Sequence, residues 1–360
     1  MPNGNKVTRY WERLARLSYP EYAHNRIGDG EQILDLSIWN DDLPPGVEEV
    51  ALSALPRAVG AYRIAQDKAL ITLLARKLGV EQDNIIITAG ADDALRIVSQ
   101  YCIRSGTRAL IPTPCFGRYA YHAMIQEAKI YYLPFDTYPY EFDIAKISEE
   151  VYKRKIECLY IASPNNPTGH ALSRKSIKHL LDAVQCSVIL DESLLIAGNA
   201  KSNMAYVSQY PNLFICGSFS KLYGLPGLRV GYLATSLDHI KRLKQLVSPF
   251  GVDAFGLEVA KHMVTQDAWL QKRVAAINEG ITTLRNANNP LLRVSNTSAP
   301  VALVEYVGAE GNLHDLLSNQ GVLTVPSQEF PGLDKANAVR VIIKGVKDML
   351  QLTRALANIS

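Results

Sequence analysis

Three side chains that could perform chemistry together lie on one glycine-rich stretch, SFSKLYGLPGLRVGY, at residues 218–232. They are Ser218, Lys221 and Arg229, and an apolar run at 213–216 precedes them and predicts a strand. The planar guanidinium of arginine suits a phosphate because it can donate two parallel hydrogen bonds. A neutral lysine amine can attack a carbonyl carbon. The stretch therefore predicts a turn that holds a phosphate and supplies a nucleophile; the alternative is an ordinary surface turn with solvated charges.

Two other polar stretches also follow apolar runs. SPNNPTG occupies residues 163–169 after a predicted strand at 159–162, and LDES occupies 190–193 at the end of an apolar run at 187–190. In open α/β sheets the functional groups gather at the carboxyl ends of the strands. The two stretches argue against the surface-turn alternative, and we expect all three stretches to contribute to one site.

Together, SPNNPTG, LDES and SFSK…GLRVGY resemble the motifs of the fold-type I aminotransferases that depend on pyridoxal 5'-phosphate (PLP). The closest branch is the group of histidinol-phosphate aminotransferases and threonine-phosphate decarboxylases. The motifs occur in the order of that family, and the resemblance covers nearly the whole chain. It implies PLP as the cofactor, a small-molecule amino acid and a 2-oxo acid as substrates, and a homodimer with shared active sites.

The resemblance also implies roles for individual residues. Lys221 is the position that forms the Schiff base with PLP and then moves the α-proton, and Asp191 is the position that pairs with the protonated pyridine nitrogen. Ser218 and Arg229 occupy positions that bind the phosphate. Asn166 occupies the position that donates a hydrogen bond to the ring oxygen and also contacts the substrate carboxylate.

A second phosphate-binding element is expected near residue 90. A β-branched run at 84–88 precedes Gly90, Ala91 and Asp92, and a helix is expected from there to about residue 103. The first N–H groups of a helix and the helix dipole favour an anion. The resemblance implies that the backbone amides of this turn contact the PLP phosphate.

Other site positions follow from the resemblance alone. Phe116 would stack on the pyridine ring, and Arg340 would bind the substrate α-carboxylate, although a surface ion pair is the alternative for Arg340. Tyr62 would cross the dimer interface to the PLP phosphate of the partner, although the family motif has proline after this tyrosine. Candidates for cations that would bind a phosphate on the substrate are Arg26, Arg63 and Arg118.

One position departs from the family pattern. Aminotransferases usually carry a tyrosine three residues after the aspartate that pairs with the pyridine nitrogen, and this chain has Leu194 there. The missing hydroxyl would leave the ring oxygen less stabilised as an anion. The threonine-phosphate decarboxylase branch also has a residue without a hydroxyl at this position. Leu194 therefore keeps both transamination and decarboxylation open.

Composition narrows the class of protein. The chain has 360 residues, 48% of them hydrophobic and 20% charged, with a net charge of +3. A small net charge is not typical of proteins that bind nucleic acid or an acidic membrane. The five cysteines are scattered without a CxxC pair, which indicates reduced thiols and a cytoplasmic location. The seven histidines lack metal-binding spacing, so no metal is expected.

The alternation of short apolar strands and helices from residue 60 to 235 predicts an α/β fold with a mostly parallel sheet flanked by helices. Long helices and later strands predict a smaller α+β C-terminal domain. We expect an N-terminal arm at 1–40, containing a helix near 8–17, a large PLP-binding domain at 41–245 and a small domain at 246–360.

These observations favour a PLP-dependent aminotransferase that acts on an amino acid or an amino-acid-like amine, with or without a phosphate. The alternative within the same chemistry is a decarboxylase, lyase or cyclase of the threonine-phosphate decarboxylase type. An alternative of another class is a protein that binds PLP or an amine without catalysis. The combination of Lys221, Asp191 and Arg229 argues against this last alternative.

Overall fold

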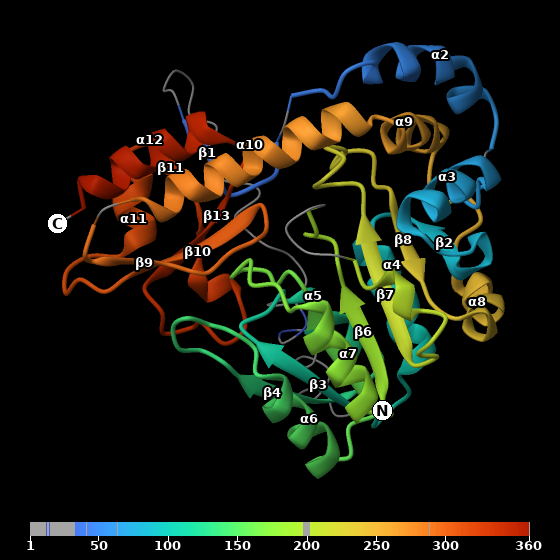
Figure 1. Cartoon of the computed structure of the whole chain (residues 1–360), viewed down its shortest axis with the longest axis horizontal. Coiled ribbons are helices and arrows are strands. Elements are labelled where there is room, and N and C mark those ends of the chain that lie inside the picture. Colours follow the sequence, from blue (N-terminus) through green and yellow to red (C-terminus); the bar gives the residue numbers. More distant parts are fainter. Residues whose placement is uncertain are drawn as a thin grey trace.

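The computed structural model describes residues 33–40, 42–62, 64–196, 202–287 and 289–359, together with residues 12 and 14. The helix expected near residues 8–17 and the candidate cations Arg26 and Arg63 lie outside the described residues. The described elements form a seven-stranded sheet, a four-stranded sheet (the smaller sheet below) and a separate two-stranded sheet, with helices packed against them (Figure 1). No helix within the described residues is long and apolar enough to cross a membrane.

The larger sheet has seven strands, and its strand order places the predicted motif strands side by side. The order is β2 (Ile85–Thr88), β8 (Gly231–Ala234), β7 (Leu213–Ser218), β6 (Ser187–Asp191), β5 (Cys158–Ala162), β3 (Arg108–Thr113) and β4 (Lys129–Pro134). Only β8 is antiparallel to its neighbours. The predicted α/β fold with a mostly parallel sheet is therefore confirmed.

Helices cover both faces of this sheet, which explains why its central strands are apolar throughout. One apolar core joins the sheet to α3 (Lys68–Leu78), α6 (Ile144–Lys153) and α7 (Arg174–Ala183). A second core on the other face joins it to α4 (Ala91–Cys102), α5 (Arg118–Ile125) and α8 (Leu237–Leu243). α3 begins where Asp67 accepts a hydrogen bond from the Leu70 amide at 2.9 Å.

The smaller sheet is antiparallel, in the order β12 (Val325–Pro326), β13 (Ala338–Ile342), β10 (Val301–Tyr306) and β9 (Leu292–Val294). Its core contains residues of α10 (Asp267–Arg285) and α12 (Val346–Ala357). A short helix, α11 (Leu313–Ser318), precedes β11 (Val322–Leu323), which pairs in parallel with β1 (Leu34–Asp35). This two-stranded sheet joins the segment before the large sheet to the C-terminal part of the chain.

Two further helices lie beside the large sheet. α9 (Ala254–Val264) places Leu257, Ala260 and Met263 in the same core as α3 and α7, and α2 (Val47–Gly60) packs on α9 (Figure 1). Short 3₁₀ helices occur at Gln82–Asn84, Met204–Tyr206, Lys244–Leu246 and Ser327–Glu329. The domain boundary expected at residue 246 stays a prediction, and the packing of α9 favours a boundary within α10.

Candidate active site

Strand register brings two of the predicted phosphate-binding stretches together. Gly231 of β8 lies opposite Thr88 of β2 on one side and opposite Ser218 of β7 on the other. A Cβ atom at Gly231 would lie 2.7 Å from the Ala91 amide nitrogen, so the first turn of α4 packs directly on β8. Only glycine permits this approach. The end of β7 and the beginning of α4 therefore form one surface.

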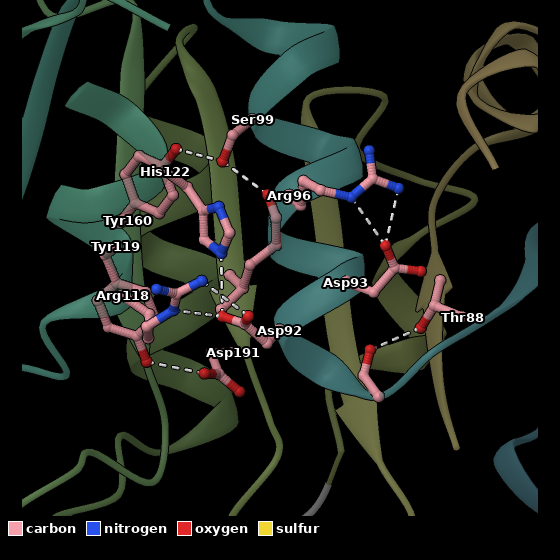
Figure 2. A network of polar contacts seen from close by, with 12 residues as sticks. Thr88, Asp92, Asp93, Arg96, Ser99, Arg118, Tyr119, His122, Tyr160 and Asp191 are labelled. Atoms are coloured by element: carbon pink, nitrogen blue, oxygen red, sulfur yellow. Dashed lines mark hydrogen bonds and ion pairs between the residues drawn. The ribbon is translucent and has the colours of Figure 1, made fainter. Parts of the chain in front are cut away.

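The turn before α4 is shaped for an anion. Gly90 precedes the helix at φ 84°, and the Thr88 hydroxyl donates to its carbonyl at 2.9 Å (Figure 2). A Cβ atom at Gly90 would lie 2.6 Å from Nη2 of Arg229, so the guanidinium rests on this backbone. The first N–H groups of a helix have no partner within the helix. A phosphate at this position would meet a cation and backbone donors together.

Asp191 ends β6 as a buried carboxylate. Its Oδ2 accepts a hydrogen bond from the Tyr119 hydroxyl at 2.8 Å, and its Oδ1 accepts one from the Ser193 amide at 2.8 Å (Figure 2). Burial raises the pKa of Asp191, and the hydrogen bonds from Ser193 and Tyr119 oppose this rise. A buried carboxylate is tenable as an anion when a cation pairs with it. The protonated pyridine nitrogen of PLP is a cation of this kind.

Asp92 turns its side chain away from the turn. Arg118 donates to both of its carboxylate oxygens, at 2.8 and 2.9 Å, and His122 Nε2 lies 2.9 Å from Oδ1 (Figure 2). Burial favours a higher pKa for Asp92, but the contacts with His122 and Arg118 outweigh burial and hold the pKa well below its usual range. Arg118 is thus paired with Asp92, and its expected contact with a substrate phosphate stays a prediction.

The SPNNPTG loop follows β5 and lies next to Asp191. The Ser163 amide donates to the Asp191 carbonyl at 3.0 Å, and Asn165 Nδ2 donates to the Pro114 carbonyl at 3.0 Å. This ties the loop to the segment that carries Phe116, whose half-buried ring meets Tyr119 edge-on at 5.9 Å. The Oδ1 atom of Asn166 is buried without a hydrogen-bond partner. Such an atom points to a ligand, so these residues fit PLP.

Lys221 follows β7, and its surroundings are aromatic and cationic. Its Nζ atom lies 5.0 Å from the centre of a Trp39 ring. Its carbonyl oxygen accepts hydrogen bonds from Nε and Nη2 of Arg273, at 3.2 and 3.0 Å. Near Trp39, Leu194 is buried with Ala299, Val301 and Ile342. The position at which the family has a tyrosine is therefore packed in an apolar cluster.

Arg340 and Tyr62 are the two remaining predicted site residues. Arg340 of β13 is buried, its Nη2 atom donates to the Ser37 carbonyl, and its Cζ atom lies 6.0 Å from the Phe330 ring centre. Tyr62 is 88% exposed, and its ring centre lies 4.9 Å from that of Phe250. Within one chain, the structure therefore places Tyr62 on the surface.

Sequence reasoning missed three residues that contact the site residues. Tyr119 lies in the first turn of α5, three residues after Phe116, and no sequence motif marked it. Trp39 is one of only three tryptophans in the chain and stands in a polar stretch. Arg273 carried no signal, because it lies 52 residues from Lys221 on a helix with other basic residues.

Comparison with known proteins agrees with this geometry. The family described as aminotransferase class I and II matches residues 48–359. A histidinol-phosphate aminotransferase of Buchnera aphidicola subsp. Melaphis rhois is 25% identical over 308 residues, which cover 83% of this chain and 84% of that protein. Among solved structures, histidinol-phosphate aminotransferase from Sinorhizobium meliloti in complex with pyridoxal-5'-phosphate has a TM-score of 0.79 at 19% identity and covers 94% of this chain and 96% of that chain.

L-threonine-O-3-phosphate decarboxylase from Porphyromonas gingivalis shares the fold as well, with a TM-score of 0.74 at 24% identity, and covers 90% of this chain and 98% of that chain. Both branches named by the motif resemblance are therefore found among the similar proteins. The match to the family extends over most of the chain. The resemblance expected from the motifs is confirmed, and the chain belongs to the class I and II aminotransferases.

Proposed function

We propose that this PLP-dependent aminotransferase works at the surface formed by the ends of β5, β6 and β7 and the beginning of α4. The reaction moves the amino group of an amino acid to a 2-oxo acid. The observation that carries the assignment is the buried Asp191 carboxylate, which ends the strand beside the one that leads to Lys221. Burial makes this carboxylate dependent on a cation, and PLP provides one.

When bound, PLP supplies an electron sink for the substrate α-carbon. Asp191 holds the proton on the pyridine nitrogen, and the hydrogen bond from Tyr119 orients the carboxylate. Lys221 attaches the cofactor through its amine. The free Lys221 amine would move the proton at the substrate α-carbon as general base and acid.

The other residues would bind and orient the cofactor and the substrate. The Ser218 hydroxyl, the Arg229 guanidinium and the amides at Gly90, Ala91 and Asp92 would hold the phosphate. Asn166 would donate a hydrogen bond from its amide nitrogen to the ring oxygen, and Phe116 would cover one face of the ring. Arg340 would bind the substrate carboxylate and would exchange its contact with the Ser37 carbonyl for two donated hydrogen bonds.

A decarboxylase is the second candidate, and Leu194 favours it. The residue is buried among apolar side chains and offers no hydroxyl to the ring oxygen. The similar structure from Porphyromonas gingivalis is named as a decarboxylase. If another group positions the substrate carboxylate, the same residues would give decarboxylation, because the orientation of the substrate selects which bond breaks.

The proposal also includes a homodimeric assembly and a cytoplasmic location. We expect a homodimer in which Tyr62 reaches the partner's phosphate site, because Tyr62 is exposed within one chain and available to a second copy. The five cysteines are free thiols, which supports a reducing cytoplasm.

The deciding experiment follows the absorbance of the PLP-loaded protein while amino acids and histidinol phosphate are added one at a time. Conversion of the visible band to the pyridoxamine form, with release of a keto acid, supports transamination and begins to identify the donor. Release of carbon dioxide without pyridoxamine supports decarboxylation. Reduction should trap a covalent adduct of PLP with the original protein and not with Lys221→Ala. If Lys221→Ala still forms the adduct, the proposed site is wrong.

A further inference from the structure

Trp39 is a buried tryptophan that contacts the proposed site without belonging to any motif. It is 5% exposed, and its ring centre lies 5.0 Å from the Lys221 Nζ atom. Its cluster contains Leu194, whose side chain offers no hydroxyl near the site. An indole face attracts a cation more strongly than any other aromatic side chain. Trp39 therefore contributes both an apolar wall and an attraction that acts on the Lys221 amine.

The segment that carries Trp39 is fixed to the smaller sheet. The Leu36 amide donates to the Leu323 carbonyl at 2.9 Å, and the Ile342 amide donates to the Leu36 carbonyl at 3.0 Å. Lys344 Nζ donates to the Asp35 carbonyl at 3.2 Å. Arg340 donates to Ser37, two residues before Trp39. The position of Trp39 therefore follows the position of the sheet that holds Arg340.

Arg273 contacts the backbone of Lys221, whereas Trp39 contacts its side chain. Besides its two hydrogen bonds to the Lys221 carbonyl, its Cζ atom lies 5.5 Å from the Trp39 ring centre and 5.2 Å from the Trp269 ring centre. Arg273 belongs to α10, which joins the two halves of the molecule (Figure 1). Leu270 of this helix packs in a core of the large sheet, and Ile277 packs in the core of the smaller sheet.

We propose that Trp39 and Arg273 form a clamp that positions Lys221, with Trp39 acting on the amine and Arg273 on the backbone carbonyl. The inference rests on the proposed function, because it takes Lys221 as the residue that moves the proton. Both residues are positioning residues. The clamp links Lys221 to the segment that contacts Arg340. The position of the Lys221 amine therefore depends on the position of Arg340, the residue proposed to bind the substrate carboxylate.

The test uses two conservative variants of the full-length, PLP-loaded protein. Trp39→Phe keeps an aromatic ring but weakens the attraction to the amine, and Arg273→Lys keeps the charge but removes the two-donor fork. We expect each variant to lower kcat about three- to thirtyfold while KM for the amino donor changes less than about twofold. The visible circular dichroism of the bound cofactor should also fall, because its linkage to Lys221 is held less rigidly.

Lys272→Arg is the matched control, since Lys272 precedes Arg273 on α10 and its side chain is exposed. It should leave kcat and the visible circular dichroism within about twofold of the original protein. Thermal melting shows whether each variant is folded; if Trp39→Phe fails to fold, Arg273→Lys, at a half-buried position, decides the question.

Three results would overturn the clamp. In the first, both variants match the original protein in kcat and visible circular dichroism. In the second, only KM rises, which would make Trp39 and Arg273 substrate-binding residues. In the third, the original protein forms no visible band with PLP; this outcome contradicts the proposed function and removes the clamp with it, and the wild-type spectrum alone distinguishes it from the other two.

Discussion

At the scale of single residues, burial in the folded protein favours the protonated form of Asp191, whereas pairing with PLP favours the charged form. Burial raises the pKa of Asp191, so the folded chain without PLP keeps a proton that the unfolded chain has lost. Stability then falls as pH rises above the pKa that Asp191 has in the unfolded chain, and the cost is complete once pH exceeds the raised pKa of the folded chain. We expect Asp191→Asn to raise the Tm of the PLP-free protein at neutral pH and to lower the Tm gained on adding PLP, both measured by scanning fluorimetry.

Glu192 offers a matched control for this prediction. It is also buried with a pKa raised by burial, but its carboxylate accepts hydrogen bonds from Ser202 and Asn203 instead. Glu192→Gln should keep the full Tm gain with PLP and the original kcat. Asp191→Asn should lower kcat by on the order of 10²–10³, the cost of breaking a buried ion pair. An equal Tm gain in Asp191→Asn and the original protein would disprove the pairing of Asp191 with the cofactor.

Tyr119 permits a second test at the same scale. Burial, followed by the charge of Asp191, raises the pKa of Tyr119 well above its ordinary value, so the hydroxyl stays protonated and donates to Asp191. Removing one hydrogen bond to a charged group costs about 1.5–3 kcal/mol. Tyr119→Phe should therefore weaken PLP binding roughly tenfold to a hundredfold, which an equilibrium titration of cofactor absorbance measures.

The control for Tyr119 is Tyr160, whose ring stacks on that of Tyr119 with 5.9 Å between centres. Its hydroxyl lies 2.6 Å from Ser99 Oγ and not at Asp191 (Figure 2). Tyr160→Phe should change stability without changing PLP affinity. Equal losses of affinity in the two variants would mean that the aromatic stack, rather than the hydrogen bond, supports the site.

At the scale of elements, the beginning of α4 tests the phosphate site. Gly90 has φ 84°, and a Cβ atom there would displace the Arg229 guanidinium. Gly79, at the end of α3, also has positive φ at 71°, but a Cβ atom there would meet nothing within 4 Å. Both Gly→Ala variants strain the backbone by about 1 kcal/mol or more. Only Gly90→Ala should also weaken PLP binding, by about tenfold or more; similar PLP affinities in both would contradict the phosphate site.

Elements and single contacts differ in how well the sequence predicted them. Apolar runs predicted strands β2, β5, β6 and β7 to within two residues, because local periodicity reports burial in a sheet. The pairing of Arg118 with Asp92 joins residues 26 positions apart, and no local pattern encodes such a contact.

At the scale of the whole molecule, exposed apolar residues indicate where a second copy would bind. Those on α2 and on the segments beside it are Leu52, Leu55, Val59, Tyr62, Ile64 and Phe250. A large exposed apolar patch is typical of a protein interface. In a twofold symmetric dimer this patch would meet its own copy. We therefore expect the protein to sediment at twice its chain mass of 39.8 kDa.

A mixing experiment tests whether the two copies share their sites. A Lys221→Ala chain keeps Tyr62, and a Tyr62→Ala chain keeps Lys221, so a mixed dimer has one site with both native residues if Tyr62 crosses the interface. If the chains reassort at random, about a quarter of all active sites would have both native residues. PLP affinity of that fraction should equal that of the original protein, whereas unmixed Tyr62→Ala should bind more weakly. If mixing leaves only weak sites, Tyr62 acts within its own chain or not at all, because a contact made across the interface is the one kind that mixing can restore.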